Sequence, residues 1–291
     1  MQVLLLLIIS LNLNILQNFI PMKQSLLSKN LLPFSAILLD MDGILFHGMN
    51  AIDGAIDFML AIKHIPHVFI TNNPIRRPQA MAEKMADIGF TRPHNQQIIT
   101  AGEATALWLD QQKKHYRFYA VGAKGLTESL QQYGHEDSKN ADYVVIGEGE
   151  GIDYSAITTG INLLIKQDAQ LISTNPDISV DAFYHGKRAI MPGGGALVAP
   201  FEIASGKQAI TIGKPEPLLY EIALQQLDVS ASDCLMIGDR PDTDILGAQK
   251  LGIQTALVRT GRFSSEETLP ENITPDWDVE NLKQLQSLFK L

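Results

Sequence analysis

The stretch Ile37-Leu38-Leu39-Asp40-Met41-Asp42-Gly43 decides the fold that we expect for this chain. It is an aliphatic strand that ends in two carboxylates, and a glycine follows at once. In an open α/β sheet, ligands bind beyond the carboxyl ends of the strands, so both acids would lie where a ligand binds. Residues i and i+2 of an extended chain point to the same side, so Asp40 and Asp42 can act on one ligand. Gly43 allows the chain to turn away sharply.

An Asp-x-Asp-Gly sequence also occurs in ordinary turns and in calcium-binding loops. An EF-hand loop that began at Asp40 would need glycine at its sixth position and glutamate at its twelfth. The chain has Leu45 and Ala51 there, so the calcium interpretation fails. An ordinary turn remains the alternative until the other strand ends are considered.

From residue 36 onward, short aliphatic runs alternate with longer amphipathic segments, which is the pattern of βα units around a parallel sheet. Strands are expected at residues 36–40, 67–71, 117–121, 143–147, 171–174, 209–212, 234–239 and 255–258. The clearest helices are expected at residues 55–64, 78–88, 103–113, 218–227 and 242–251. Because these strands are too many for one simple sheet, we expect two domains. The fold class is α/β, with a doubly wound, Rossmann-like core (22–101 and 208–291) and an inserted α/β cap (102–207).

Three other expected core strands end in polar motifs. The second ends in Thr71-Asn72-Asn73-Pro74, whose hydroxyl and amides suit phosphate oxygens. The third places Lys214 between glycine and proline just before a helix, as a point charge near a strand end. The fourth ends in the acidic loop Asp239-Arg240-Pro241-Asp242-Thr243-Asp244. Each motif alone is better explained as a turn, a solvated lysine or a helix cap. Together, at the carboxyl ends of core strands, they favour one site.

These four motifs, in this order, resemble the haloacid dehalogenase superfamily. Within it, the chain resembles the NagD-like branch of nucleotide and 4-nitrophenyl phosphatases, which carry an α/β cap between the second and third motifs. The segment Thr174-Asn175-Pro176-Asp177 and the glycines at 193–195 also resemble that cap, and Asn175, Asp177 and these glycines are candidates for substrate contacts. The resemblance extends from about residue 35 to the end of the chain.

The resemblance implies a role for each site residue. Asp40 would be the nucleophile that forms an aspartyl-phosphate, since an ionised carboxylate needs no base to attack phosphorus. Asp42 would protonate the leaving oxygen and then take a proton from the hydrolytic water. The residues that would bind the phosphoryl oxygens are Thr71, Asn72, Asn73 and Lys214.

The charges of this predicted site indicate a metal ion. Four carboxylates converge on an anionic substrate, and at an effective dielectric constant of ~20 each like-charge pair at 4 Å costs roughly 4 kcal/mol. Lys214 alone cannot offset that repulsion. Mg²⁺ favours one or two carboxylates plus substrate phosphate. The predicted ligands are Asp40, Asp239 and the backbone carbonyl of Asp42, with Asp244 beside them but not on the metal.

Composition limits the partners that we expect. The 291 residues are 45% apolar and include 23 Lys and Arg against 32 Asp and Glu, a net charge of −9. Such a negative net charge does not favour nucleic acid as a binding partner. A small phosphorylated metabolite is the expected partner. The single Cys234 excludes an intrachain disulfide and cysteine-based zinc sites, which fits a cytoplasmic location.

The first 21 residues lie outside the resemblance. They contain the apolar run 3–9, but polar residues interrupt it well short of the roughly 20 apolar residues that span a bilayer. No Lys or Arg precedes the run and no small-residue cleavage site follows it. We expect residues 1–21 to be a misassigned or disordered extension before Met22, with a signal or anchor peptide as the alternative, and we expect no membrane partner.

The expected function is magnesium-dependent hydrolysis of a small phosphomonoester, whether a nucleotide, a sugar phosphate or a short-acid phosphate. A phosphomutase would use the same acids, and a metabolite-binding module would keep the fold without turnover. The cap would select the substrate, which the motifs do not identify. The oligomeric state stays open, with the cap as the surface through which a homo-oligomer would form.

Overall fold

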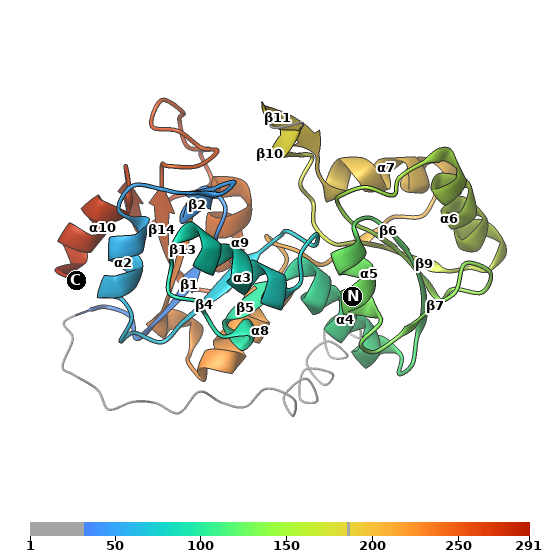
Figure 1. Ribbon diagram of the computed structural model, residues 1–291, viewed down its shortest axis with the longest axis horizontal. Coiled ribbons are helices and arrows are strands. Elements are labelled where there is room, and N and C mark those ends of the chain that lie inside the picture. The colour runs from blue at the N-terminus through green and yellow to red at the C-terminus, as the bar shows by residue number, and fades with distance from the viewer. Residues whose placement is uncertain (1–31, 185–186) are drawn as a thin grey trace.

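The computed structural model describes residues 32–184 and 187–291, and the expected N-terminal extension at 1–21 lies outside them. Two α/β units lie side by side, one around a six-stranded sheet and the other around a five-stranded sheet (Figure 1). The predicted fold class, a doubly wound parallel-sheet core with an inserted α/β unit, is confirmed.

The core sheet is parallel throughout and has the strand order β15-β14-β13-β1-β4-β5. In chain order its strands are β1 (Ala36–Leu39), β4 (His67–Thr71), β5 (Ile98–Thr100), β13 (Cys234–Gly238), β14 (Gln254–Val258) and β15 (Trp277–Val279). The first strand, β1, is central. Strands β4 and β5, which come next in this sheet along the chain, lie on one side of β1, and β13, β14 and β15 lie on the other. The order therefore reverses between β1 and β13, and this switch point is where doubly wound sheets bind ligands.

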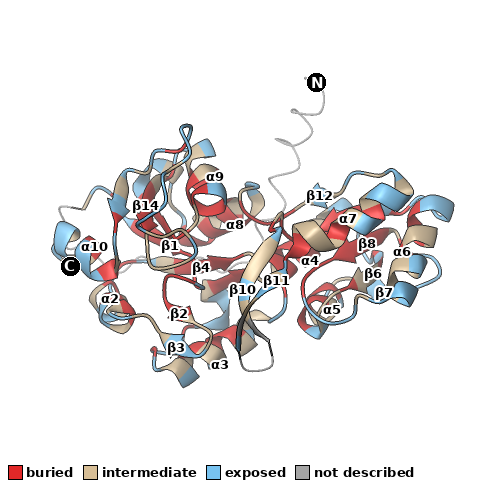
Figure 2. Ribbon diagram, turned by 90° about the horizontal axis from the view of Figure 1, so that it is seen from above, coloured by how far each residue is buried: buried red, intermediate tan, exposed pale blue. Residues whose placement is uncertain are grey.

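Helices cover both faces of the core sheet because its central strands are apolar on both sides. All four residues of β1 are buried, with Leu38 packed in one hydrophobic cluster and Ile37 and Leu39 in another. The first cluster includes residues of α4 (Ala101–Gln112), α8 (Leu218–Leu227) and α9 (Leu246–Lys250). The second includes residues of α2 (Ala55–Ala61), α3 (Pro78–Ile88) and α10 (Leu282–Phe289). Figure 2 shows the resulting buried layer along the sheet.

The second sheet is also parallel throughout, with the order β12-β9-β8-β6-β7. Its strands are β6 (Arg117–Val121), β7 (His135–Glu136), β8 (Tyr143–Ile146), β9 (Gln170–Ser173) and β12 (Ile210–Thr211). Residues of α5 (Lys124–Leu130) are buried in the cluster that also contains Leu38, whereas α6 (Tyr154–Lys166) and α7 (Gly194–Ser205) pack in a separate one. Strand β12 lies beyond residue 207, so this sheet extends past the predicted end of the cap.

One hydrophobic cluster is shared by the two units. It contains Leu38 and Met236 of the core sheet together with Phe118 and Val145 of the second sheet. Helices α4 and α8 contribute to the same cluster. Apolar packing therefore fixes how the second unit is placed over the end of the core sheet.

Hairpins and short helical turns complete the site end of the core. The hairpin of β2 (Phe46–His47) and β3 (Asn50–Ala51) follows β1, and the hairpin of β10 (Ser179–Tyr184) and β11 (Lys187–Pro192) projects from the second unit toward the core (Figures 1 and 2). The short turns are η2 (Asn95–Gln97), η3 (Ala231–Asp233) and η4 (Pro241–Ile245). The helix predicted at 242–251 is divided between η4, a π-helical turn, and α9.

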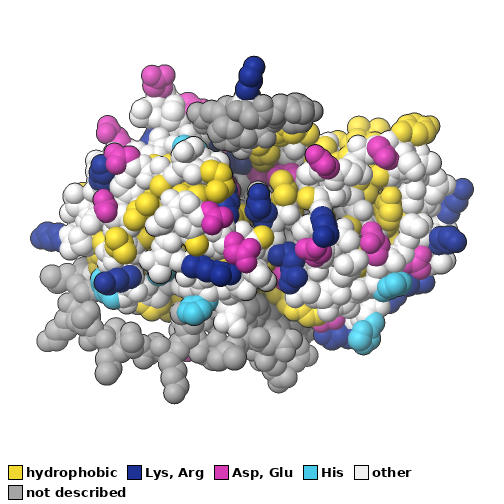
Figure 3. All heavy atoms as spheres, in the orientation of Figure 1, with side chains coloured by type: hydrophobic (Ala, Val, Ile, Leu, Met, Phe, Trp, Pro, Cys, Tyr) yellow, Lys and Arg dark blue, Asp and Glu magenta, His cyan; other side chains and the backbone are white. Residues whose placement is uncertain are grey.

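The surface of the described part mixes both signs of charge. On the face in Figure 3, Lys and Arg side chains lie among Asp and Glu side chains. Within residues 32–184 and 187–291, no helix combines the length and the apolar character needed to cross a bilayer.

Candidate active site

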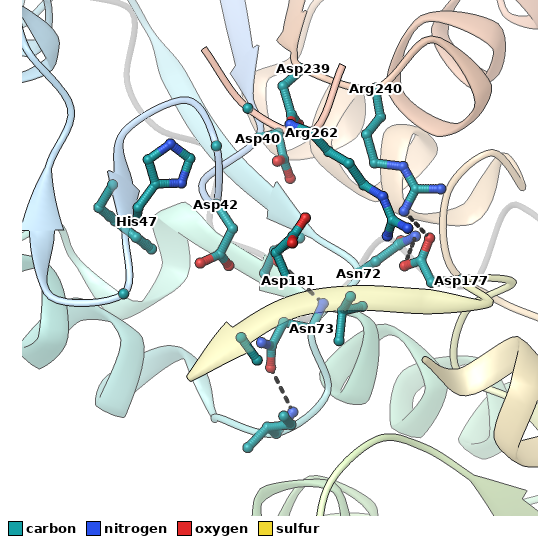
Figure 4. Close-up of a pocket in the computed structure, with 18 of the residues that line it drawn as sticks. Asp40, Asp42, His47, Asn72, Asn73, Asp177, Asp181, Asp239, Arg240 and Arg262 are labelled. Atoms are coloured by element: carbon teal, nitrogen blue, oxygen red, sulfur yellow. Dashed lines mark hydrogen bonds and ion pairs between the residues drawn. The ribbon is translucent and has the colours of Figure 1, made fainter. Parts of the chain in front are cut away.

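A cavity of about 550 Å³ lies at the carboxyl end of the core sheet and is lined by residues of both units. Figure 4 shows Asp40, Asp42 and Asp239 in it, with Asp177 and Asp181 approaching from the second unit. The structure brings all of the predicted site residues to this one cavity. They are Asp40, Asp42, Thr71, Asn72, Asn73, Lys214, Asp239 and Asp244.

Lys214 is the buried cation of the site, with its side chain only 2% exposed. Its Nζ donates to Asp40 Oδ1 and to Asp244 Oδ1, both at 2.7 Å, and to the carbonyl oxygen of Ile70 at 3.2 Å. Burial by itself lowers the pKa of Lys214, but Asp244 and Asp40 raise it above its usual value. The lysine is therefore a fixed positive charge beneath the cavity.

Three buried carboxylates remain crowded around this lysine. Burial raises the pKa of Asp40 well above its usual value; Lys214 opposes that shift, and Asp244 and Asp239 add to it. Burial and the charge of Asp244 likewise raise the pKa of Asp239 to about 7. A further cation among these oxygens would stabilise the ionised carboxylates.

Three carboxylate oxygens lie close enough together that they could hold a metal ion. Within the described residues, Asp40, Asp239 and Asp244 offer oxygens that lie within 4.8 Å of one another. Both oxygens of Asp244 are engaged, one by Lys214 and the other by the backbone N–H of Arg240 at 3.1 Å. From the part of the chain that the structure describes, Asp40 and Asp239 each accept one hydrogen bond, on one oxygen. Carboxylate oxygens of this kind are hard donors, which fit Mg²⁺.

Two glycines let the backbone close around Asp239. A Cβ added at Gly43, whose φ is +85°, would lie 2.5 Å from Asp239 Oδ2, and one added at Gly261 would lie 1.8 Å from it. The backbone N–H of Arg262 donates to the same oxygen at 2.7 Å. Gly261 and Arg262 were not predicted as site residues, because the sequence marks them only by their position shortly after the end of a predicted strand.

Asp42 lies at a more open part of the cavity, with its side chain half exposed. Lys84 of α3 lies 3.6 Å from Asp42 Oδ1, and its Nζ is 3.9 Å from the centre of the Phe46 ring. Burial lowers the pKa of Lys84, and Asp42 opposes that shift. Lys84 was not predicted, because in the sequence it is one polar residue of an amphipathic helix.

The loop after β4 holds Thr71 and Asn73 at the cavity. The backbone N–H of Asn73 donates to Thr71 Oγ1 at 3.2 Å, and Asn73 Oδ1 accepts from the N–H of Ile75 at 2.8 Å. The Asn72 amide differs, because it donates to Asp177 Oδ2 at 3.1 Å and to the carbonyl oxygen of Lys214 at 2.9 Å. Both amide hydrogens are thus used inside the protein. In this structure the amide therefore holds the loop, and the contact of Asn72 with phosphoryl oxygens stays a prediction.

The cap candidates divide into two groups. Asp177 lines the cavity, and Asn175 is fully buried behind it. The glycines at 193–195 do not line the cavity and instead allow close packing at the start of α7. A Cβ at Gly193 would lie 2.2 Å from the carbonyl oxygen of Asp177, and one at Gly195 would lie 2.3 Å from that of Pro176.

Glu148 is a buried carboxyl group that lines the cavity from the second unit. Its Oε1 accepts from Asn175 Nδ2 at 2.9 Å. Burial raises the pKa of Glu148 to about 7, partly opposed by Asn175 and increased by Asp177. Glu148 lies in the glycine-rich segment 147–151, where no site residue was predicted. Nothing in the residue pattern showed that the glutamate is turned inward.

Glu148→Gln is expected to flatten the dependence of stability on pH. A carboxyl whose pKa is raised on folding destabilises the folded state progressively as pH rises from about 4.5 to about 7. Between pH 5 and pH 8 the wild type should therefore lose about 2 kcal/mol more unfolding free energy than the variant. Urea unfolding at both pH values measures this difference. Equal losses would show that Glu148 is ionised at the same pH in both states.

The fold and cavity define a class of α/β hydrolases with paired strand-end aspartates and an inserted cap, and comparisons with known proteins agree. Residues 37–136 match the model of haloacid dehalogenase-like hydrolases, and residues 211–285 match a second, HAD-hydrolase-like model. An acid sugar phosphatase from Staphylococcus saprophyticus is 33% identical over 256 residues, which is 87% of this chain and 96% of that protein.

Solved structures show the same likeness. NagD from Escherichia coli K-12 is 29% identical, with a TM-score of 0.77 over 86% of this chain and 98% of its own. A 4-nitrophenylphosphatase from Thermotoga maritima is 27% identical, with a TM-score of 0.80 over 88% of this chain and 97% of its own. The chain belongs to the haloacid dehalogenase-like hydrolase family. Within that family it is a phosphatase of the NagD-like branch, as the motifs predicted.

Proposed function

We propose that this phosphatase hydrolyses small phosphomonoesters with Mg²⁺ through an aspartyl-phosphate on Asp40. The observation that carries the proposal is the convergence of Asp40, Lys214 and Asp239 at the switch point of the core sheet, with Asp42 on the open side of the same cavity. Sugar phosphates come first among the substrate classes, because similar proteins are named acid sugar phosphatases. Nucleotides and short-acid phosphates remain candidates.

The positions of the side chains support a separate catalytic role for each of them. Asp40 presents a carboxylate oxygen that Lys214 does not occupy, and this oxygen is the proposed nucleophile. Asp42, two residues further on and half exposed, can reach the leaving oxygen and afterwards a water molecule. Thr71 and the backbone of the 71–73 loop, together with Lys214, supply donors and positive charge for the phosphoryl oxygens.

We assign the metal to Asp40, Asp239 and the backbone carbonyl of Asp42, with Asp244 holding Lys214 and the backbone of Arg240. When bound, Mg²⁺ would neutralise the charge of the substrate phosphate and of the carboxylates. We also propose that the unit at 102–207 serves as the cap, since Asp177, Val180 and Asp181 reach the cavity from it.

A phosphate-release screen over phosphorylated metabolites, with Mg²⁺ and with EDTA, tests this function. We expect magnesium-dependent release from at least one sugar, nucleotide or short-acid phosphate. Isomerised product with little free phosphate would favour a phosphomutase. Binding of phosphate esters without turnover would favour a binding module.

Asp42→Asn is expected to slow hydrolysis most for poor leaving groups. An alkyl phosphate needs a proton on its leaving oxygen, whereas 4-nitrophenolate leaves readily without one. We expect the loss in kcat/KM to be about 10²-fold or more for an alkyl phosphate and smaller for 4-nitrophenyl phosphate under single-turnover conditions. Losses of the same size on both substrates would contradict the acid role of Asp42.

A further inference from the structure

Asn72 and Asp177 connect the loop after β4 to the cap across the cavity. The Asn72 amide donates to Asp177 Oδ2 at 3.1 Å, although the two residues are 105 positions apart in the chain. Asp177 is 4% exposed, so this hydrogen bond is shielded from water. The second amide hydrogen of Asn72 goes to the carbonyl oxygen of Lys214 at 2.9 Å. One side chain therefore joins the second motif, the third motif and the cap.

Asp177 also contacts the fourth motif. Its Oδ1 accepts from Nη1 of Arg240, the residue that follows the proposed metal ligand Asp239, and the same guanidinium pairs with Asp242. Figure 4 shows the side chains of Arg240 and Asn72 both directed toward Asp177. The two oxygens of Asp177 thus accept hydrogen bonds from two different loops of the site, one from Asn72 and one from Arg240.

Asn175 supports the same loop from behind. Its Nδ2 donates to the backbone carbonyl of Asn72 at 2.9 Å and to Glu148 Oε1 at 2.9 Å. Its own Oδ1 accepts from the backbone N–H of Asp177 at 3.1 Å. The cap segment 174–178 therefore forms hydrogen bonds with both the backbone and the side chain of Asn72. A shift of this segment would move the 71–73 loop.

We propose that Asp177 is a positioning residue. It acts through Asn72 to hold the proposed phosphate-binding loop at 71–73 at a fixed position relative to Asp239. This inference rests on the proposed function, because the loop must bind a phosphoryl group. Asp177 does not need to touch the reacting atoms. Its effect comes from geometry, since displacing a bound group by about 1 Å can cost 10²-fold in rate.

A double-mutant cycle tests the inference with Asn72→Ala, Asp177→Ala and the combined variant. We expect each single change to lower kcat/KM for 4-nitrophenyl phosphate by about 10- to 100-fold. If Asp177 acts through Asn72, the combined variant should be no worse than the poorer single variant. Inorganic phosphate, measured by calorimetry in the presence of Mg²⁺, should bind more weakly to all three variants by a similar factor.

Asp168→Ala is the matched control, because Asp168 is another cap carboxylate paired with a basic residue, Lys207, but lies outside the cavity. It should keep wild-type kinetics and phosphate affinity. Losses that multiply in the combined variant, or wild-type phosphate affinity in Asp177→Ala, would overturn the inference. An inactive wild type would instead count against the proposed function. In that case phosphate affinity alone still decides whether Asp177 and Asn72 act together.

Discussion

Asp40→Asn is expected to abolish phosphate release from 4-nitrophenyl phosphate while the protein stays folded. The amide is nearly the size of the carboxylate but cannot attack phosphorus, so the covalent step is lost. We expect kcat to fall by at least about 10³-fold. Folding should survive, because Asp40 is one of three crowded buried carboxylates and Lys214 keeps Asp244 as its partner.

The measurement is steady-state phosphate release, accompanied by thermal unfolding of each variant. Asp57→Asn is a suitable control, because Asp57 is an exposed carboxylate of α2 away from the cavity. It should retain wild-type turnover. Substantial release by Asp40→Asn, with its unfolding midpoint close to that of wild type, would remove Asp40 as the nucleophile.

Lys214→Met is expected to reduce both stability and activity. The change leaves Asp40 and Asp244 buried without their shared cation, and breaking a buried ion pair from one side typically destabilises by 3–5 kcal/mol. Lys214 also opposes the rise in the pKa of Asp40, so its removal would raise that pKa further and leave less ionised nucleophile at neutral pH. We therefore expect a loss of about 3 kcal/mol or more in unfolding free energy and little turnover.

Urea unfolding and phosphate release, both at pH 7, measure these two effects. Lys207→Met provides the comparison, because Lys207 also pairs with an aspartate but on the surface of the second unit. Exposed pairs contribute about 0–1 kcal/mol, so this variant should remain close to wild type. If the two lysine variants were equally stable, Lys214 would not be the electrostatic centre of the site.

The sequence was sufficient to predict the central strands and the residues at their ends. Strands β4 and β6 and helices α3 and α8 lie where the hydrophobic periodicity placed them. Strands β5 and β15 were missed, because each has only three residues and so gives too little alternation to recognise. The hairpin of β10 and β11 was also missed, although it brings Asp181 to the cavity.

The candidate site was predictable to the extent that it is built from strand ends. Asp40 and Asp239 follow core strands, and parallel topology brings such positions together. Lys214 instead follows β12, which was expected in the core but pairs with β9 in the second sheet. Side-chain direction was not predictable. The Asn72 amide turns to Asp177, and Glu148 turns inward from a glycine-rich loop, through contacts between residues far apart in the chain. A local pattern carries no information about such partners.

The proposed mechanism depends most directly on a covalent phosphoryl group at Asp40, and trapping this group in Asp42→Asn is the decisive measurement. That variant lacks the base for the second half-reaction, so the intermediate should accumulate with 4-nitrophenyl phosphate and Mg²⁺. Acid quenching and borohydride reduction would convert a phosphorylated aspartate to homoserine, which peptide mass spectrometry locates. We predict homoserine at position 40 only when substrate is present. Its absence there while wild type still releases phosphate, or its appearance at another aspartate, would contradict the account.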